Sequence, residues 1–180
     1  MPKVNPHTKK THTSFSAKDA GVRYGVGVNP CKIRLIIGLG NPDKKYGKTY
    51  HNIGVLFIEY LAENGYADAE LVKSNAFMNQ SGPMVAKLLR KSGVKPKEIL
   101  VAHDDSDIEL GKYKVCFGRG SAGHKGVESI INSLSTKNFW RLRIGIGKKP
   151  KAKAEELVLK KIGKNDWEIL QKTFSTIQLI

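Results

Sequence analysis

Apolar runs separated by turn residues organise the first part of this chain. Residues 33–39 are rich in β-branched side chains and almost continuously apolar, which predicts a strand buried on both faces. Residues 40–43 follow with Gly, Asn, Pro and Asp, which are typical of a turn. Apolar residues then recur at the helical spacing of three and four, which predicts a first helix carrying Ile53, Leu56, Phe57, Tyr60 and Leu61.

A second helix is predicted after a gap without a clear pattern. Ser81 is predicted to cap this helix, with Pro83 tolerated in its first turn. Gly93 and Pro96 are predicted to end it, because glycine favours the helix C-terminus and proline cannot continue a helix.

The remaining sequence continues to alternate between strand and helix patterns. Residues 99–102 predict another buried strand, whereas residues 112–117 and 141–146 predict strands with alternating polar positions, the latter half-exposed. Further helices are predicted around residues 127–134 and 167–177. This order predicts an α/β fold: a single three-layer domain with a mixed, mainly parallel sheet and helices on both faces.

The domain is predicted to occupy residues 32–180. Residues 1–31 contain three prolines, five basic residues and one acidic residue, without an amphipathic period. We expect a basic, disordered N-terminal extension there, because the stretch has neither the apolar core of a secretory signal nor the arginine content of a transit peptide.

The formal net charge of the chain is +15, from 31 Lys and Arg residues against 16 Asp and Glu residues. Such a charge favours an anionic partner such as nucleic acid, although a merely well-solvated surface is the alternative. The lysine-rich stretch at residues 148–153 is either a phosphate contact or a solvated loop.

Several classes of protein are disfavoured. The longest apolar runs are far shorter than the ~20 residues that span a bilayer, so no membrane association is expected. Cys31 and Cys116 match no metal-ligand spacing, which predicts a protein of a reducing compartment, the cytoplasm, without metal or cofactor. A dinucleotide loop would need glycine where Asp43 stands.

Polar residues of catalytic types follow the predicted strands or precede the predicted helices. They are Asn41, His51, Asn79, Asp104 and His124. The carboxyl ends of strands in an open α/β sheet form its ligand crevice, so these residues are predicted to share a site.

Within this set, His51 is the candidate general base, since histidine ordinarily titrates near pH ~6.5. Asp104 is the candidate orienting carboxylate, and the Asn41 and Asn79 amides can donate to a carbonyl oxygen that gains charge. Each residue taken alone also fits a cap or turn. Because no nucleophile motif is evident, the set favours hydrolysis by base-activated water.

Five motifs, in order, resemble the bacterial-type peptidyl-tRNA hydrolase family. They lie at residues 35–54, 77–82, 102–107, 118–126 and 141–147, and the resemblance covers about residues 33–175. The family hydrolyses the ester that joins a peptide to the 3′ end of tRNA. The resemblance therefore implies a monomeric enzyme of translation that needs no cofactor, with peptidyl-tRNA as its partner.

The resemblance also implies a role for each matching residue. His51 would activate water, Asp104 would orient it, and Asn41 would distinguish peptidyl from aminoacyl ends. The remaining positions would contact substrate, with Met78 lining the cleft and Asn79 able to support the oxyanion: Tyr46, Phe77, Met78, Asn79, His124, Lys125 and Arg143.

Three departures from the family pattern stand out. Lys125 replaces an asparagine in the His-Asn-Gly loop. The segment 63–76 is much shorter than in the family, which usually places additional strands there, so a smaller sheet is expected. The extension 1–31 is additional, and the last helix looks clipped. These departures raise an alternative, a catalytically weak relative that only binds RNA, but the retained His–carboxylate pair favours the enzyme.

Overall fold

A mixed five-stranded sheet forms the centre of the computed structural model, which describes residues 32–148, 153–177 and 179. The strands are β1 (Leu35–Gly38), β2 (Glu70–Lys73), β3 (Ile99–Glu109), β4 (Tyr113–Phe117) and β5 (Trp140–Gly147). Their order is β2-β1-β3-β5-β4, and only β4 runs antiparallel to its neighbour. The predicted fold class, a mainly parallel sheet within three layers, is confirmed.

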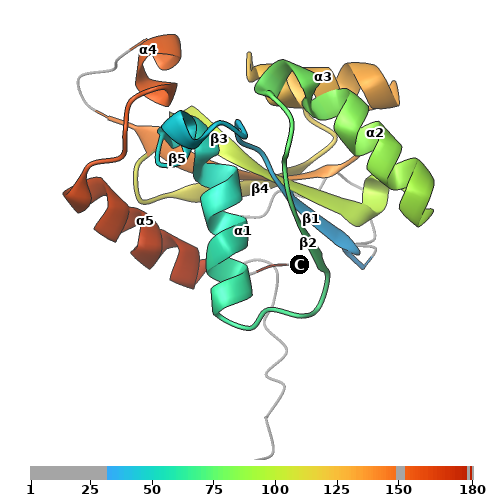
Figure 1. Cartoon of the computed structure of the whole chain (residues 1–180), viewed down its shortest axis with the longest axis horizontal. Helices are drawn as coiled ribbons and strands as arrows, with labels where there is room; N and C mark the ends of the chain where they lie inside the picture. The colour runs from blue at the N-terminus through green and yellow to red at the C-terminus, as the bar shows by residue number, and fades with distance from the viewer. Residues whose placement is uncertain (1–31, 149–152, 178, 180) are drawn as a thin grey trace, which may run out of the picture.

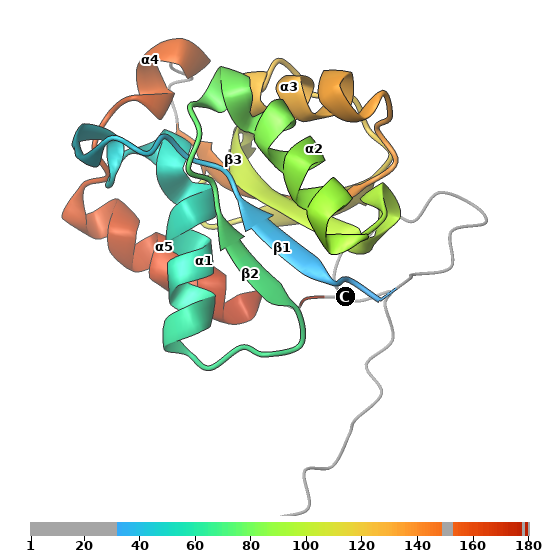
Figure 2. The same ribbon diagram turned by 45° about the vertical axis from the view of Figure 1, so that its right-hand side comes forward.

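Five α-helices flank the sheet within the described residues: α1 (Ile53–Glu63), α2 (Ser81–Ser92), α3 (Lys125–Leu134), α4 (Ala154–Val158) and α5 (Lys164–Thr176). Short 3₁₀ turns precede several elements: η1 (Lys44–Tyr46), η2 (Tyr50–Asn52), η3 (Met78–Gln80) and η4 (Pro96–Glu98). Helices α1 and α5 cover one face of the sheet, and α2 and α3 cover the other (Figures 1 and 2). None of these helices combines the length and apolarity that a membrane crossing requires.

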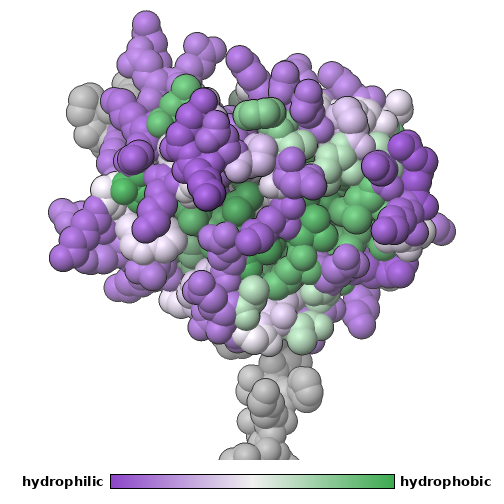
Figure 3. Space-filling view, viewed as in Figure 1, coloured by the Kyte–Doolittle hydropathy of each residue, from purple (hydrophilic) through white to green (hydrophobic). Residues whose placement is uncertain are grey.

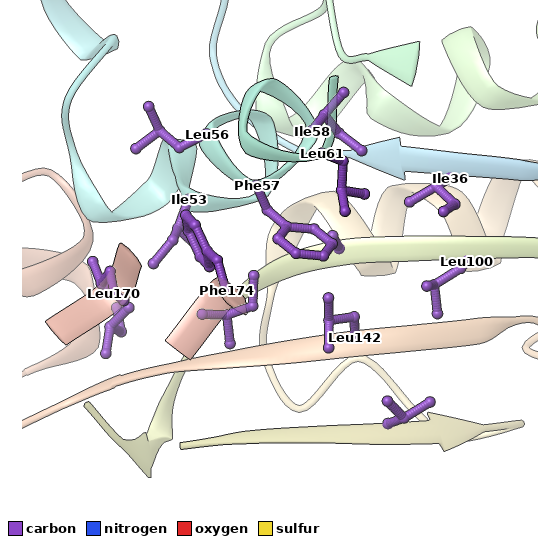
Figure 4. Close-up of a cluster of buried hydrophobic side chains, with 14 of the residues drawn as sticks. Ile36, Ile53, Leu56, Phe57, Ile58, Leu61, Leu100, Leu142, Leu170 and Phe174 are labelled. Carbon is purple, nitrogen blue, oxygen red and sulfur yellow. The ribbon is translucent and has the colours of Figure 1, made fainter. Parts of the chain in front are cut away.

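Alternation along the strands divides the core between the two faces. On the α1 and α5 side, Phe57 packs edge-to-face on Phe174 with ring centroids 5.3 Å apart, above Leu142 of β5 (Figure 4). On the α2 and α3 side, Val85 and Ile130 pack among other buried side chains. Both faces of the sheet are therefore buried, as the apolar run at residues 33–39 predicts.

The edge strand β2 borders an open groove on one side of the molecule. Hydrophilic side chains cover most of the face in Figure 3, but an apolar band crosses its middle. A cavity of about 660 Å³ beside β2 and α2 is lined by apolar residues such as Val72 and Leu88 and by lysines such as Lys87. The edge strand β2 comes from the short segment 63–76. The pattern of this segment did not predict a strand, because only two of the residues Glu70–Lys73 are apolar.

Two strand predictions were wrong in their extent or burial. Strand β3 does not end at Ala102 but continues to Glu109, because its polar side chains find partners on neighbouring elements. Strand β5 is not half-exposed: Arg141 is only 2% exposed, since β5 lies inside the sheet between β3 and β4. Alternation of charge was therefore a poor guide to exposure here.

The start of α2 also differs from the prediction. Ser81 lies inside the helix rather than capping it, and its buried hydroxyl has no hydrogen-bond partner among the described residues. The N–H of Gly82 instead donates to Ser129 Oγ of α3 (2.9 Å). A neighbouring helix thus satisfies the first turn of α2, whereas Gly93 ends α2 in the left-handed conformation, as predicted.

Helix α1 approaches the sheet closely because Gly54 has no side chain. A Cβ atom on Gly54 would lie 2.2 Å from the carbonyl oxygen of Ala102 and 2.5 Å from the nitrogen of Leu39. Both contacts are with backbone, at Leu39 just after β1 and at Ala102 within β3. This approach brings η2, which immediately precedes α1, to the end of β1 and the middle of β3.

We expect Gly54→Ala to lower the free energy of unfolding by at least about 1–3 kcal/mol, the usual cost of overpacking a rigid core. Urea denaturation measures the change. Gly120→Ala is the control, because a Cβ there meets no atom within 4 Å. Equal stability of the two variants would show that the helix can move away without cost.

Candidate active site

Three side chains from separate elements meet just beyond the carboxyl end of β1, beside the middle of β3. His51 comes from η2, Asp104 from β3, and His124 from the residue that caps α3. The structure thus brings these three predicted residues together.

The Asp104 carboxylate joins the two imidazoles. Its Oδ1 lies 2.8 Å from Nδ1 of His51 and 3.1 Å from Nε2 of His124. The residue is only 3% exposed. Burial alone would raise the pKa of the Asp104 carboxyl, but the two histidines outweigh burial and hold this pKa well below its usual range. Asp104 is therefore a carboxylate at neutral pH.

The hydrogen bonds fix where each imidazole carries its proton. Nδ1 of His124 accepts the backbone N–H of Val127 (3.2 Å), so the proton of neutral His124 is on Nε2 and is donated to Asp104. The carboxylate likewise requires a proton on Nδ1 of His51. Nε2 of His51 is then left with a lone pair, which is the form that a general base needs.

The same geometry bears on metal binding. The ligand atoms of His51, Asp104 and His124 lie within 4.8 Å of one another, a spacing that a metal ion could bridge. However, the Val127 N–H keeps a proton on the His124 nitrogen that faces Asp104, so that nitrogen is a donor and not a ligand. The donor set fits a hydrogen-bonded triad better than a metal centre.

A third histidine lies behind the triad. His103 is 1% exposed, and its ring packs edge-on against His124 with centroids 4.6 Å apart. Its Nδ1 donates to the carbonyl oxygen of Asp104 (2.7 Å). Burial, followed by the nearby His124 and Arg141, lowers the pKa of His103 well below its ordinary value. His103 therefore stays neutral.

Asn41 and Asn52 connect the end of β1 to the turn that carries His51. The N–H of Asn41 donates to Asn52 Oδ1 (2.8 Å), and Asn52 Nδ2 donates to the carbonyl oxygen of Asn41 (3.0 Å). Asn41 Oδ1 also accepts the N–H of Met78 (3.0 Å). Asn41 thus organises two segments of the site, and its Nδ2 makes no hydrogen bond within the described part of the chain. Asn52 was not predicted as a site residue, because an asparagine before a helix also fits a cap or turn.

The neighbouring carboxylates have other partners. Asp105 Oδ2 accepts from Nε of Arg143 (2.6 Å), and Asp105 Oδ1 accepts the N–H of Asp107 (3.0 Å). Asp104, the predicted orienting carboxylate, is therefore the one of these three aspartates that is bonded to His51. Arg143 reaches the site through Asp105.

A cavity of about 390 Å³ opens beside the triad. His51, Asp104, His124 and Lys125 line one part, and Val158 of α4 and Leu159, which follows α4, line another. No helix was predicted in the region of α4, since five helical residues are too few to establish a period. The acidic residues in its first turn were the available signal.

Comparison with known proteins identifies the family. The model of the family described as "Peptidyl-tRNA hydrolase" matches residues 35–179. A peptidyl-tRNA hydrolase of Thermodesulfovibrio yellowstonii is 41% identical over 145 residues, which cover 69% of this chain and 78% of the relative. One of Aquifex aeolicus is 39% identical, covering 68% of this chain and 73% of the relative. The chain belongs to the peptidyl-tRNA hydrolase family. The predicted resemblance is confirmed.

A solved structure supports the same assignment. The crystal structure of peptidyl-tRNA hydrolase from Acinetobacter baumannii superposes with a TM-score of 0.73 at 31% sequence identity. The alignment covers 83% of this chain and 86% of that chain. Fold and family therefore agree over most of the described domain.

Not every residue expected to contact substrate in this family faces the cavity. Tyr46 ends η1 with Lys45 Nζ 4.9 Å from its ring centroid, and Phe77 is 47% exposed. Asn79 is exposed, and its carbonyl oxygen accepts from Ser129. Met78 does not line the cavity as expected. It is 6% exposed, and its sulfur abuts Gly126, because η3 turns this side chain into the core between the sheet and α3.

The buried His103 should make the stability of the folded protein depend on pH in the acidic range. Since its pKa is lowered in the folded protein, the unfolded chain binds a proton below pH ~6.5 that the folded chain does not, and stability falls with falling pH. Between pH 6.5 and 4.5 we expect the free energy of unfolding of His103→Gln to change less steeply with pH than that of wild type, by up to ~1.4 kcal/mol per pH unit. Urea denaturation across this range measures the slope. Parallel curves for the two proteins would contradict a neutral buried His103.

Proposed function

We propose that this protein hydrolyses the ester bond of peptidyl-tRNA, with His51 as the base that activates water. The hydrogen bond between His51 Nδ1 and Asp104 Oδ1 carries the proposal, because it directs the basic Nε2 away from the carboxylate. Membership of the peptidyl-tRNA hydrolase family supports the substrate, and the charge of +15 suits a polyanion such as tRNA. Peptidyl-tRNA arises at ribosomes, so we expect the activity in the cytoplasm.

The proposed reaction proceeds in two steps. In the first, Nε2 of His51 takes a proton from water, and the resulting hydroxide adds to the ester carbonyl carbon, giving a tetrahedral oxyanion. In the second, the oxyanion collapses, the bond to the ribose oxygen breaks, and the His51 imidazolium returns its proton to that oxygen. Asp104 stabilises the imidazolium between the steps. The products are a peptide carboxylic acid and tRNA with a free hydroxyl.

Asn41 and Asn79 are proposed to bind the substrate. Asn41 has Nδ2 left as a donor, which suits recognition of a carbonyl on the peptide side of the ester. Asn79, like Tyr46 and Phe77, lies on the outer surface near the site and is proposed to meet the tRNA end. Arg143 is proposed to act by holding Asp105 rather than by direct contact.

The alternative, a protein that only binds RNA, does not explain the triad. An RNA contact does not require a buried carboxylate that accepts from two imidazoles.

The basic stretch 148–153 remains a proposed contact with tRNA phosphates. Lys153 is exposed and is proposed to make such a contact, whereas Lys148 is paired with Asp166. Its residues 149–152 lie outside the described part of the chain, as does the predicted extension 1–31.

The first test is release of peptide from purified peptidyl-tRNA. We expect wild type to turn over and His51→Ala to be slower by ~10²- to 10⁴-fold, the range for a positioned acid–base group. Binding of tRNA, measured by filter retention, should change little. An alanine variant that hydrolyses at the wild-type rate would remove His51 from the mechanism.

The second test concerns Lys125, the departure in the loop after His124. The Lys125 side chain lines the same cavity as His51. Lys125 is also the first residue of α3, where a positive charge interacts unfavourably with the helix dipole. An ammonium there also disfavours the imidazolium formed during the reaction. We expect Lys125→Asn to raise kcat more than it raises affinity for tRNA. A lower kcat in the variant would mean that Lys125 itself supports the reaction.

A further inference from the structure

The turn that carries His51 depends on outside contacts. It is a 3₁₀ turn of three residues, and Thr49, the residue that caps it, makes no side-chain capping bond. Such short turns have little stability of their own. Asn52, at one end, is held by the amide pair with Asn41. The position of His51 therefore depends on what holds the other end.

The chain between α4 and α5 holds that other end. The N–H of Tyr50 donates to the carbonyl oxygen of Lys160 (3.2 Å), and the N–H of Ile162 donates to that of Lys48 (2.9 Å). Thr49 and Lys161 form an antiparallel bridge between these two hydrogen bonds. A segment more than a hundred residues away in sequence is thus paired with the residues just before His51.

Tyr50 adds a side-chain contact to this pairing. It is 2% exposed, and its hydroxyl donates to Oδ2 of Asp166, in the first turn of α5. The ammonium of Lys148 forms an ion pair with the same oxygen and lies 5.5 Å from the centroid of the Tyr50 ring. Tyr50, Lys148 and Asp166 therefore form one cluster that joins η2, the end of β5 and α5.

We propose that Asp166 is a positioning residue for this reaction: through Tyr50 it fixes the turn that places His51 against Asp104. The proposal rests on the proposed function of His51. Asp166 does not line the cavity beside the triad, so it acts through its neighbour and not on substrate.

Charge makes the cluster persistent at neutral pH. Burial alone would raise the pKa of the Asp166 carboxyl, but its bonds with Lys148 and Tyr50 outweigh burial and lower that pKa. Asp166 thus remains ionised. Removing the carboxylate would leave the Tyr50 hydroxyl without its acceptor and the Lys148 ammonium without its counter-ion.

Two changes of kinetics should follow from loosening the turn. Misplacing a catalytic group by about 1 Å can cost ~10²-fold, so we expect Tyr50→Phe and Asp166→Ala each to lower kcat by ~10- to 100-fold with KM nearly unchanged. Weaker contact with Asp104 would also destabilise the His51 imidazolium. The acidic limb of the pH–rate profile should therefore move to lower pH.

The experiment compares these variants with matched ones on purified peptidyl-tRNA. Tyr113→Phe is the control, because the Tyr113 hydroxyl also bonds α5, at the carbonyl oxygen of Thr176 (3.1 Å), but Tyr113 is not part of η2. Tyr50→Phe/Asp166→Ala should be no slower than the slower single variant, since both remove one interaction. Asp166→Asn keeps an oxygen that can accept from Tyr50 and should retain most of kcat.

A readout that needs no activity separates this proposal from the function on which it rests. The Nδ1 proton of His51, followed by ¹H–¹⁵N NMR, should shift or broaden in Tyr50→Phe but not in Tyr113→Phe. Unchanged kcat and an unchanged resonance in Tyr50→Phe would overturn the positioning role, even if wild type is active. An inactive wild type with a shifted resonance would overturn the function and leave the positioning role supported.

Discussion

The buried carboxylate of Asp104 is the constraint around which the site is built. A carboxylate that is 3% exposed must be paired with donors, and here one oxygen accepts from two imidazoles. Together with the bond from the Val127 N–H, those two hydrogen bonds set the tautomer of both histidines, and they join β3 to η2 and to His124, which caps α3. If Asp104 were protonated, His51 would lose the group that keeps its proton on Nδ1.

The fold meets this constraint through close backbone contacts. Gly54 lets α1 begin against the end of β1 and the middle of β3, so that η2 carries His51 Nδ1 to within 2.8 Å of Asp104 Oδ1. The pairing of Asn41 with Asn52 holds one end of η2, and the chain leading into α5 holds the other. The catalytic geometry is thus assembled from segments far apart in sequence, and no local segment could maintain it alone.

Much of this was predictable from apolar periodicity and motif order: the mainly parallel sheet, α1, α2, α3 and α5, and the residues of the triad. What escaped prediction depends on tertiary contacts. Arg141 was expected to be exposed because it is charged, Ser81 to cap a helix that Ser129 satisfies instead, and Met78 to line a cleft that it does not reach. The strand β2 was missed because only two of its four residues are apolar, and the helix α4 was missed because five residues cannot establish a helical period.

The most direct test of this account is the tautomeric state of the two imidazoles, read from ¹⁵N chemical shifts of histidine-labelled protein near pH 8. We expect His51 to carry its proton on Nδ1, where Asp104 accepts it, and His124 to carry its proton on Nε2. Substituting Asn for Asp104 should then abolish the preference of His51. A proton on Nε2 of His51 in the wild type would contradict the account, because no basic nitrogen would then face the cavity.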